Sequence, residues 1–173
     1  MQKIHEQIRE KFGDAVLTTH DFRGDETAIV KKEALLDILR FLKEDPELDF
    51  NVLMDLTAVD YLTYPSPFPL PRGGEGGGEG GRFEVVYHLY SLNKNHRIRI
   101  KVSVEEKDAR VPTATGLWPA ADWFEREVWD MFGIGFDGHP HLKRILMYEE
   151  FQGHPLRKDY PVNKRQPLIG PKN

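Results

Sequence analysis

The chain has 173 residues, 39% of them hydrophobic and 30% charged, which is the length and composition of one globular domain with a short extension. It contains no cysteine, which excludes a disulfide, a thiolate nucleophile, Cys-ligated zinc and a Cys-held iron–sulfur cluster. No run approaches the roughly 20 apolar residues that span a bilayer, and the N-terminus lacks the apolar stretch of a secretory signal. We therefore expect a cytoplasmic chain that reaches a membrane only through a partner.

The net charge of −4 conceals two parts of opposite sign. Residues 1–138 hold 17 Lys+Arg and 25 Asp+Glu, a net of −8, whereas residues 139–173 hold 7 and 3, a net of +4. A nucleic-acid-binding domain needs a basic surface, so the acidic first part argues against binding to nucleic acid. The two parts are expected to meet different surfaces.

The first elements in chain order are a helix, two brief strands and a second helix. Met1–Phe12 has apolar residues at four-residue spacing, and residues 15–22 and 27–30 are strand-like around the turn residues 23–25. Lys31–Glu44 carries an apolar stripe and stops just before Pro46, which predicts an amphipathic helix.

Three strands are predicted next, at residues 50–62, 83–92 and 96–104. The last alternates Arg97, Arg99 and Lys101 with aliphatic residues, which predicts one wet, basic face. The three strands could run as a meander. The order of elements predicts an α+β fold, with a mixed or antiparallel sheet, helices on one face and an extended C-terminal tail.

Residues 65–82 interrupt this pattern with four prolines and seven glycines in 18 positions. Gly76, Gly78 and Gly81 match the spacing of a dinucleotide-binding loop, but that loop leads into a helix, and here a strand follows. We interpret the segment as a flexible Pro/Gly-rich loop between two strands.

A third helix is predicted between Pro119 and Gly133, because proline favours a helix start and glycine the position after its end. Its apolar side chains share one arc and are expected to pack on the sheet: Ala120, Ala121, Phe124, Val128, Met131 and Phe132. The outer face carries Asp122, Trp123, Arg126, Trp129 and Asp130. Arg126 is four residues from both aspartates, which predicts ion pairs along the helix.

Two interpretations of this outer face remain open. A solvated helix with ordinary salt pairs accounts for the carboxylates. The two tryptophans favour an interface, since a large aromatic side chain among charges is unfavourable unless something covers it. The cover could be the chain's own basic tail or another protein.

A soluble metal-dependent hydrolase is the alternative from another class. Six potential ligands lie in this part of the chain: Glu125, Glu127, Asp130, His139, His141 and His154. No zinc-binding or di-iron spacing is present, and His139 and His154 each stand in a Gly-His-Pro turn. A turn histidine of this kind more often fixes the path of the chain than binds a metal.

The tail, residues 139–173, contains five of the 12 prolines and is therefore expected to run extended with fixed corners. It is basic and carries apolar side chains such as Leu142 and Leu156. Such a segment becomes ordered only against another surface, which is expected to be acidic.

Two motifs in this region resemble a known family. Glu125-Arg126-Glu127, then Asp130-Met131-Phe132, His139, Lys143 and Ile145-Leu146 follow the spacing of the signature of the C subunit of the proton-translocating NADH:quinone oxidoreductase, respiratory complex I. Residues 153–161, GHPLRKDYP, resemble the tail of the same family. The loop at 65–82 departs from the family pattern. The end of the chain soon after the second motif is expected of a stand-alone, bacterial-type C subunit rather than a fused C–D polypeptide.

The resemblance implies a non-catalytic subunit of the peripheral arm, on the cytoplasmic side of the inner membrane, that clamps the D and B subunits of the quinone module. FMN, iron–sulfur clusters and quinone would belong to other subunits, with no cofactor and no active site in this chain. The complex would couple electron transfer from NADH to quinone with proton translocation. Membrane-bound hydrogenases and ferredoxin-dependent complexes contain related subunits and remain an alternative.

The charge split and the prolines divide the chain into a globular domain, 1–138, and a tail, 139–173, to which the resemblance assigns partner binding. The expected partner contacts lie on the third helix and the tail: Trp123, Glu125, Arg126, Glu127, Trp129, Asp130, His139, Pro140, Arg144, Gly153, His154, Pro155, Leu156, Arg157, Lys158, Asp159, Tyr160 and Pro161.

Overall fold

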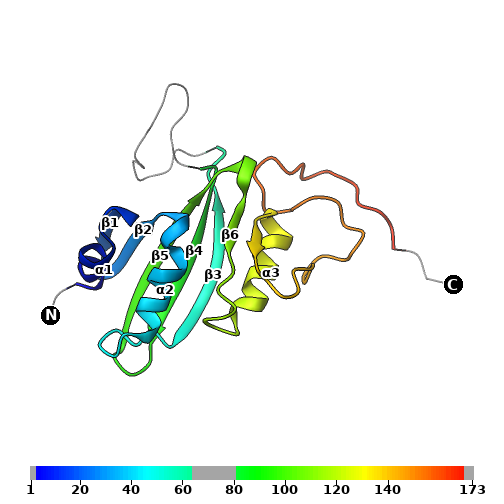
Figure 1. Cartoon of the computed structure of the whole chain (residues 1–173). Helices are drawn as coiled ribbons and strands as arrows, with labels where there is room; N and C mark the ends of the chain where they lie inside the picture. Colours follow the sequence, from blue (N-terminus) through cyan, green and yellow to red (C-terminus); the bar gives the residue numbers. More distant parts are fainter. Residues whose placement is uncertain (1–2, 64–80, 170–173) are drawn as a thin grey trace.

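A computed structural model describes residues 3–63 and 81–169, and its centre is a five-stranded sheet in the order β1-β2-β5-β4-β3 (Figure 1). The strands are β1 (Val16–Phe22), β2 (Asp25–Val30), β3 (Val52–Asp60), β4 (Phe83–Ser91) and β5 (His96–Val104). Strands β2 and β5 are parallel, and the other neighbours are antiparallel. The sheet is therefore mixed, and its last three strands form the expected meander.

Within the described residues there are three α-helices: α1 (Ile4–Phe12), α2 (Leu35–Glu44) and α3 (Ala121–Phe132). Short 3-10 turns occupy Gly13–Ala15, Lys32–Ala34 and Glu106–Asp108. A separate parallel ladder joins β6 (Arg110–Pro112) to β7 (Gly135–Asp137). The α+β class is thus confirmed, and none of the described helices has the length and hydropathy of a transmembrane span.

Helix α2 lies across one face of the sheet and buries its apolar stripe there (Figure 1). Leu35, Ile38, Leu39 and Leu42 are fully buried at the three- and four-residue spacing that one helix face requires. The predicted end at Glu44 is confirmed. The α-helix begins later than predicted, because Lys32–Ala34 form a 3-10 turn.

The sheet contributes alternate residues to this core, as a period of two requires. Val85 and Tyr87 of β4 and Ile100 and Val102 of β5 are fully buried and belong to the same cluster as the α2 leucines. Their cross-strand neighbours pair directly, with Val85 opposite Val102 and Tyr87 opposite Ile100. These pairs set the register of the central strands.

Strand β5 has the predicted bounds, but the prediction of a uniformly wet basic face is wrong. Lys101 is buried, because its Nζ lies 2.9 Å from Oε2 of Glu84, a buried carboxylate on the neighbouring β4. Arg97, near the start of the strand, remains exposed.

Helix α3 packs beside β3, and the tail runs along its outer side (Figure 1). The indole Nε1 of Trp118 donates to the carbonyl of Phe50 at 3.2 Å and joins the start of this region to the segment that leads into β3. The helix begins at Ala121, so Ala120 is exposed outside it, and Phe124 is only half-buried. The apolar arc is therefore narrower than predicted.

No helix or strand occurs in residues 139–169, which agrees with an extended tail. The predicted loop, 65–82, lies outside the described residues except for Gly81 and Arg82. The division into a domain, 1–138, and a partner-binding tail stays a prediction.

Candidate partner interface

Asp130, near the end of α3, is the point where the tail is attached to the helix. Its side chain is fully buried, and its Oδ1 accepts from Nη1 of Arg144 at 2.5 Å. Its Oδ2 accepts three consecutive backbone N–H groups, those of residues 145, 146 and 147, at 3.1, 2.9 and 2.8 Å. One carboxylate therefore turns the tail around the end of the helix.

These contacts keep Asp130 ionised. Burial on its own would raise the pKa of the carboxyl group, but the hydrogen bonds from the Met147 N–H and from Arg144 outweigh it, and the pKa falls below its ordinary value. The charge that leaves water is thus compensated by a cation and by oriented backbone dipoles.

Arg144 links this carboxylate to the rest of the tail. Its Nη2 donates to the carbonyls of Phe151 and Gly153 at 2.8 and 3.2 Å. Its guanidinium also lies 5.7 Å from the ring centre of Trp129 and 5.6 Å from that of Phe151. The chain's own tail therefore covers Trp129, which is one of the two covers considered from the sequence.

His154 and Gly133 fit together at the end of α3. The His154 Nδ1 lies 3.0 Å from the carbonyl of Asp130 and donates to it. Gly133 has φ +77, and a Cβ at this position would stand 2.7 Å from the His154 ring. The glycine is required both for the left-handed backbone and for the close approach of the ring. Here the Gly-His-Pro histidine fixes the path of the chain.

A second attachment centres on Arg82, which directly precedes β4. It forms a bidentate pair with Asp60 at 2.7 and 3.0 Å and another with Asp159 of the tail at 2.7 and 3.0 Å. Its Nη1 also donates to Glu106 at 2.7 Å, and Arg157 of the tail shares that carboxylate at 2.5 Å. Two arginines and three carboxylates thus bind the tail to the end of the sheet.

Asp60 is the buried member of this cluster. Burial by itself would raise the pKa of its carboxyl group, but Arg82 and the backbone N–H of Lys158 lower it below the ordinary value. The Lys158 N–H donates to Asp60 at 2.8 Å. Both the backbone and the side chains of the tail therefore depend on a carboxylate at the end of β3.

Glu125 belongs to a third cluster, which attaches α3 to the loop before it. Its fully buried carboxyl group accepts from the Thr113 hydroxyl at 2.5 Å and from the Ala114 N–H at 2.6 Å. The His139 Nε2 donates to the backbone carbonyl of Asp122 at 3.2 Å and lies 4.0 Å from Oε2 of Glu125. The Glu-Arg-Glu motif thus places its first glutamate inside the protein.

Burial raises the pKa of Glu125 to about 7, with a further contribution from the charge of Asp122. The folded chain therefore keeps this proton between pH 4.5 and 7, where the unfolded chain loses it. We expect the free energy of unfolding to fall as the pH rises through this window, by on the order of 3 kcal/mol. Urea denaturation at a series of pH values measures this slope.

Glu125→Gln is expected to remove this dependence, because the amide stays uncharged. Glu127→Gln is the matched control, since Glu127 is exposed two positions along the same helix. Three other titratable groups face this site: Asp122, His139, and Tyr87, whose pKa is raised by burial and then by the charge of Glu125. An unchanged pH slope in Glu125→Gln would show that Glu125 ionises normally.

The remaining predicted contact residues divide by exposure. Trp123 is 64% exposed, and the guanidinium of Arg126 lies 5.5 Å from its ring centre. Gly153, Pro155 and Tyr160 are half-buried within the tail. Those that face solvent are Glu127, Pro140, Leu156, Lys158, Asp159 and Pro161. Whether they contact a partner stays a prediction.

The ion pairs predicted along α3 are wrong. Arg126 donates instead to the carbonyls of Lys143 and Arg144, at 3.3 and 3.2 Å. Asp130 lies on the predicted outer face and is buried there, because the tail passes over it. Helical periodicity places a residue relative to its own helix and carries no information about a segment that packs on the other side.

The six potential metal ligands are not brought together. Asp130 is occupied by Arg144, the His154 ring donates to a backbone carbonyl, and Glu127 faces solvent. In the described parts of the chain no three His, Asp or Glu side chains form a group that could hold a metal ion. The geometry gives the hydrolase interpretation no support.

Sequence analysis does not identify the residues of the domain that hold the tail. Arg82, Asp60 and Glu106 lie 77, 98 and 51 residues from their partners in the tail. The composition of residues 65–82 assigns Arg82 to the loop. A weak signal exists, because Arg82 and Asp60 stand at the ends of adjacent antiparallel strands, next to the register pair Asp60–Phe83.

The geometry describes a small α+β protein whose buried charges hold its own tail in place. The family model described as "Respiratory-chain NADH dehydrogenase, 30 Kd subunit" matches residues 28–166. The chain belongs to this family, and its resemblance to the C subunit of complex I is confirmed.

Relatives from several bacteria carry the same description. The C subunit of NADH-quinone oxidoreductase from Roseiflexus sp. (strain RS-1) is 48% identical over 94% of this chain and 85% of its own. That of Geobacter sulfurreducens is 42% identical over 95% of this chain and 93% of its own. In the C/D subunit of Psychrobacter sp., 45% identical, 90% of this chain matches 25% of the relative.

Two solved structures share the fold. A trypsin-resistant fragment of Nqo5 superposes with a TM-score of 0.64 at 36% identity, covering 79% of this chain and 95% of that one. A chain of the membrane-bound sulfane sulfur reductase, an archaeal respiratory membrane complex, gives 0.65 at 26% identity, covering 91% and 84%. The fold is thus shared with a component of another respiratory membrane complex.

Proposed function

We propose that this chain is a non-catalytic subunit that clamps the D and B subunits, the quinone module of a NADH-quinone oxidoreductase, during electron transfer from NADH to quinone coupled to proton translocation. The contacts on α3 and the tail support this proposal. Arg144, Arg157 and Asp159 of the tail form ion pairs within the chain and hold in place a segment that has no helix or strand over residues 139–169.

The observation that carries the proposal is the set of large apolar side chains that the ordered tail and α3 leave facing solvent. Trp123, Leu146 and Leu156 are each more than half exposed although their neighbours are firmly held. Aromatic and aliphatic side chains fixed in this way, with an arginine beside the tryptophan, are the usual composition of an interface anchor.

The chemistry of the complex would then lie in other subunits. We propose that FMN, iron–sulfur clusters and quinone are bound there, and that this chain has no active site. Asp130, Glu125 and His154, three of its buried or half-buried titratable groups, are engaged in hydrogen bonds that hold the chain together. The chain would sit peripherally on the cytoplasmic side of the inner membrane and reach the membrane through the complex.

Trp123→Ser is expected to lower the amount of the D and B subunits that copurify with this chain in mild detergent by about tenfold or more. Loss of an anchoring tryptophan typically weakens an interface by about 2 kcal/mol or more, roughly a thirtyfold change in affinity. The free energy of unfolding of the isolated chain should change by less than about 0.5 kcal/mol, because the side chain is exposed.

Phe22→Ser is the matched control, since Phe22 of β1 is equally exposed, at 64%, on an edge strand distant from α3 in the sheet order. It should leave copurification unchanged. Wild-type recovery of the D and B subunits with Trp123→Ser would refute a partner contact at α3.

A second candidate function is the corresponding subunit of a related membrane complex with another electron donor, such as a hydrogenase or a ferredoxin-dependent enzyme. The structural likeness to a chain of the sulfane sulfur reductase favours it. NADH:quinone activity of the complex purified through this chain distinguishes the two, because the alternative complexes would not oxidise NADH.

A further inference from the structure

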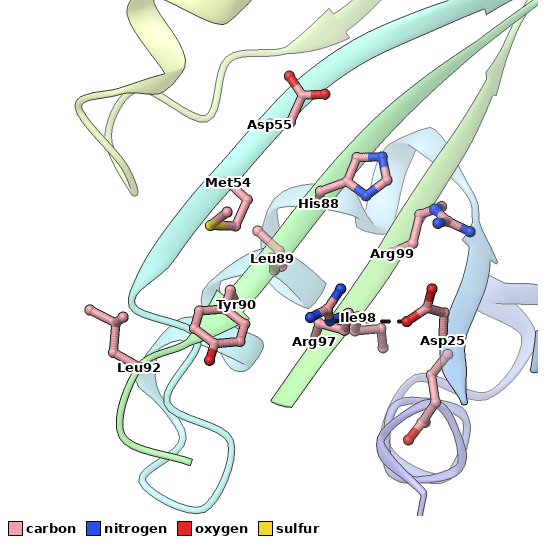
Figure 2. A pocket seen from close by; sticks show the side chains of 11 residues that line it. Asp25, Met54, Asp55, His88, Leu89, Tyr90, Leu92, Arg97, Ile98 and Arg99 are labelled. Carbon is pink, nitrogen blue, oxygen red and sulfur yellow. Dashed lines mark ion pairs between the residues drawn. The ribbon is translucent and has the colours of Figure 1, made fainter. Parts of the chain in front are cut away.

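The sheet face opposite α2 carries a hollow with a volume of about 580 Å³ (Figure 2). Figure 2 shows α2 behind the strands and the side chains of Met54, His88, Tyr90 and Arg99 in front of them. The lining comes from strands β2 to β5 and the turn after β4, and none of the lining residues belongs to a helix. The hollow therefore differs in its residues from the α3–tail interface.

One side of the hollow is apolar and faces water. Met54 of β3 is 58% exposed, and Leu92, in the turn after β4, is 66% exposed. In Figure 2 Tyr90 lies below Met54 and to the right of Leu92. Two large aliphatic side chains at one end of a sheet, next to a tyrosine, form the kind of surface that a second protein covers.

The other side is a short row of cations. Arg97 and Arg99 are alternate residues of β5, so they project from the same face about 7 Å apart. Arg99 donates to the Thr27 hydroxyl at 3.3 Å, and among the described residues no carboxylate lies within 4.0 Å of its guanidinium. Among the described residues, Arg97 has one carboxylate within this distance: Oδ1 of Asp25 lies 4.0 Å from its Nε. Both cations therefore have capacity for a further acceptor.

The carboxylates that also line the hollow leave this capacity largely unfilled. Glu26 turns toward α1, where it accepts from the His5 backbone N–H at 2.9 Å and lies 2.8 Å from the His5 ring. Asp55 is paired in register with His88, on the far side of β4 from β5. A ligand that fits the hollow therefore needs an apolar group for the first side and carboxylates for the second.

We propose that this hollow binds an acidic segment of a neighbouring subunit, with its carboxylates on Arg97 and Arg99 and an apolar side chain over Met54 and Leu92. This proposal rests on membership of a multisubunit complex. Two carboxylates two residues apart on a strand, or one turn apart on a helix, have the spacing of the two arginines. An open hollow across the strands suits a protein segment better than a small molecule, which is usually enclosed.

The test places the photo-cross-linker p-benzoylphenylalanine at Leu92 in the assembled complex and identifies the captured peptide by mass spectrometry. We expect one segment of another subunit that contains at least two carboxylates. Arg99→Glu and Arg97→Glu should each reduce the cross-linking yield about tenfold or more. Because the Arg97 side chain is exposed, its replacement should not disturb folding, so a reduced yield in that variant reports binding. Lysine at the captured acidic positions should restore the yield of both variants.

Arg40→Glu is the matched control, because Arg40 is exposed on α2 and pairs with Asp37 on the same helix. It should leave the yield unchanged. No cross-link, a cross-link to lipid, or one to a second copy of this chain would each overturn the proposal. If Trp123→Ser releases the chain whereas Arg97→Glu and Arg99→Glu leave the cross-link intact, this proposal alone fails. If Trp123→Ser has no effect and the cross-link responds as expected, the proposal for α3 fails instead.

Discussion

Replacing Asp130 by alanine is expected to lower the free energy of unfolding by about 4 kcal/mol, within the range for breaking a buried ion pair. The substitution leaves Arg144 without its carboxylate and three backbone N–H groups of the tail without an acceptor. Urea denaturation followed by tryptophan fluorescence measures the change, because Trp129 lies under Arg144 and reports the loss of the tail.

Asp130→Asn should have an intermediate effect of about 2 kcal/mol, since the amide oxygen still accepts hydrogen bonds. Asp137→Asn is the matched control: Asp137 pairs with Arg110 at 2.6 Å, but both side chains are more than half exposed, and such pairs contribute about 0.5 kcal/mol. Equal effects of Asp130→Asn and Asp137→Asn would contradict a special role of the buried carboxylate.

The acid response provides an independent check. The folded-state pKa of Asp130 is lowered, so its contribution to stability is present above the unfolded-state pKa near 4 and is lost as the pH falls toward the folded value. Asp130→Asn should therefore lose less stability than the wild type when the pH falls below about 4.

Arg82→Gln is expected to lower the free energy of unfolding by about 3 to 4 kcal/mol and to release the second half of the tail. Asp60 would remain buried without its cation, beside the carboxylates of Asp159 and Glu106. Hydrogen exchange should show faster exchange at residues 157–160, where the Lys158 N–H is bonded to Asp60. Protection near Asp130 should persist, because that attachment uses other residues.

Arg110→Gln is the control for Arg82→Gln, since Arg110 pairs with one exposed carboxylate. It should change the stability by less than about 1 kcal/mol and leave exchange in the tail unaffected. Equal protection of residues 157–160 in Arg82→Gln and in the wild type would show that the tail is held there by other contacts.

The fold is predictable where a periodic pattern covers a whole element. Helix α2 combines an apolar stripe with a stop before Pro46, and β5 alternates over nine residues, so the sequence locates both closely. The β2–β5 parallel pair is not predictable in this way, because it joins segments about 70 residues apart and leaves no local trace. The later start of α2 reflects a 3-10 turn that periodicity does not distinguish from a helix.

The candidate site is predictable in its residue types but not in its contacts. The structure brings Asp130, Arg144 and His154, three of the predicted contact residues, close together, and whether they contact a partner stays a prediction. Asp130 lies on the predicted outer face but is buried there, because the chain's own tail covers it. Periodicity also puts Glu125 at the flank of α3, whereas the loop at Thr113 buries it completely.

The sequence by itself determined the class of fold, the absence of cysteine ligands, the separation of an acidic body from a basic tail, and the family, because spacing, composition and motifs are properties of the linear chain. Only the tertiary structure decided where the tail's charges go. Arg144 and Arg157 meet carboxylates 14 and 51 residues away, within the same chain. A charged side chain pairs with the group that the fold brings close to it, and the separation in sequence does not reveal which group that is. The basic tail is thus an ordered part of the protein over its described residues, and the apolar side chains that it leaves exposed are the ones that we propose a partner covers.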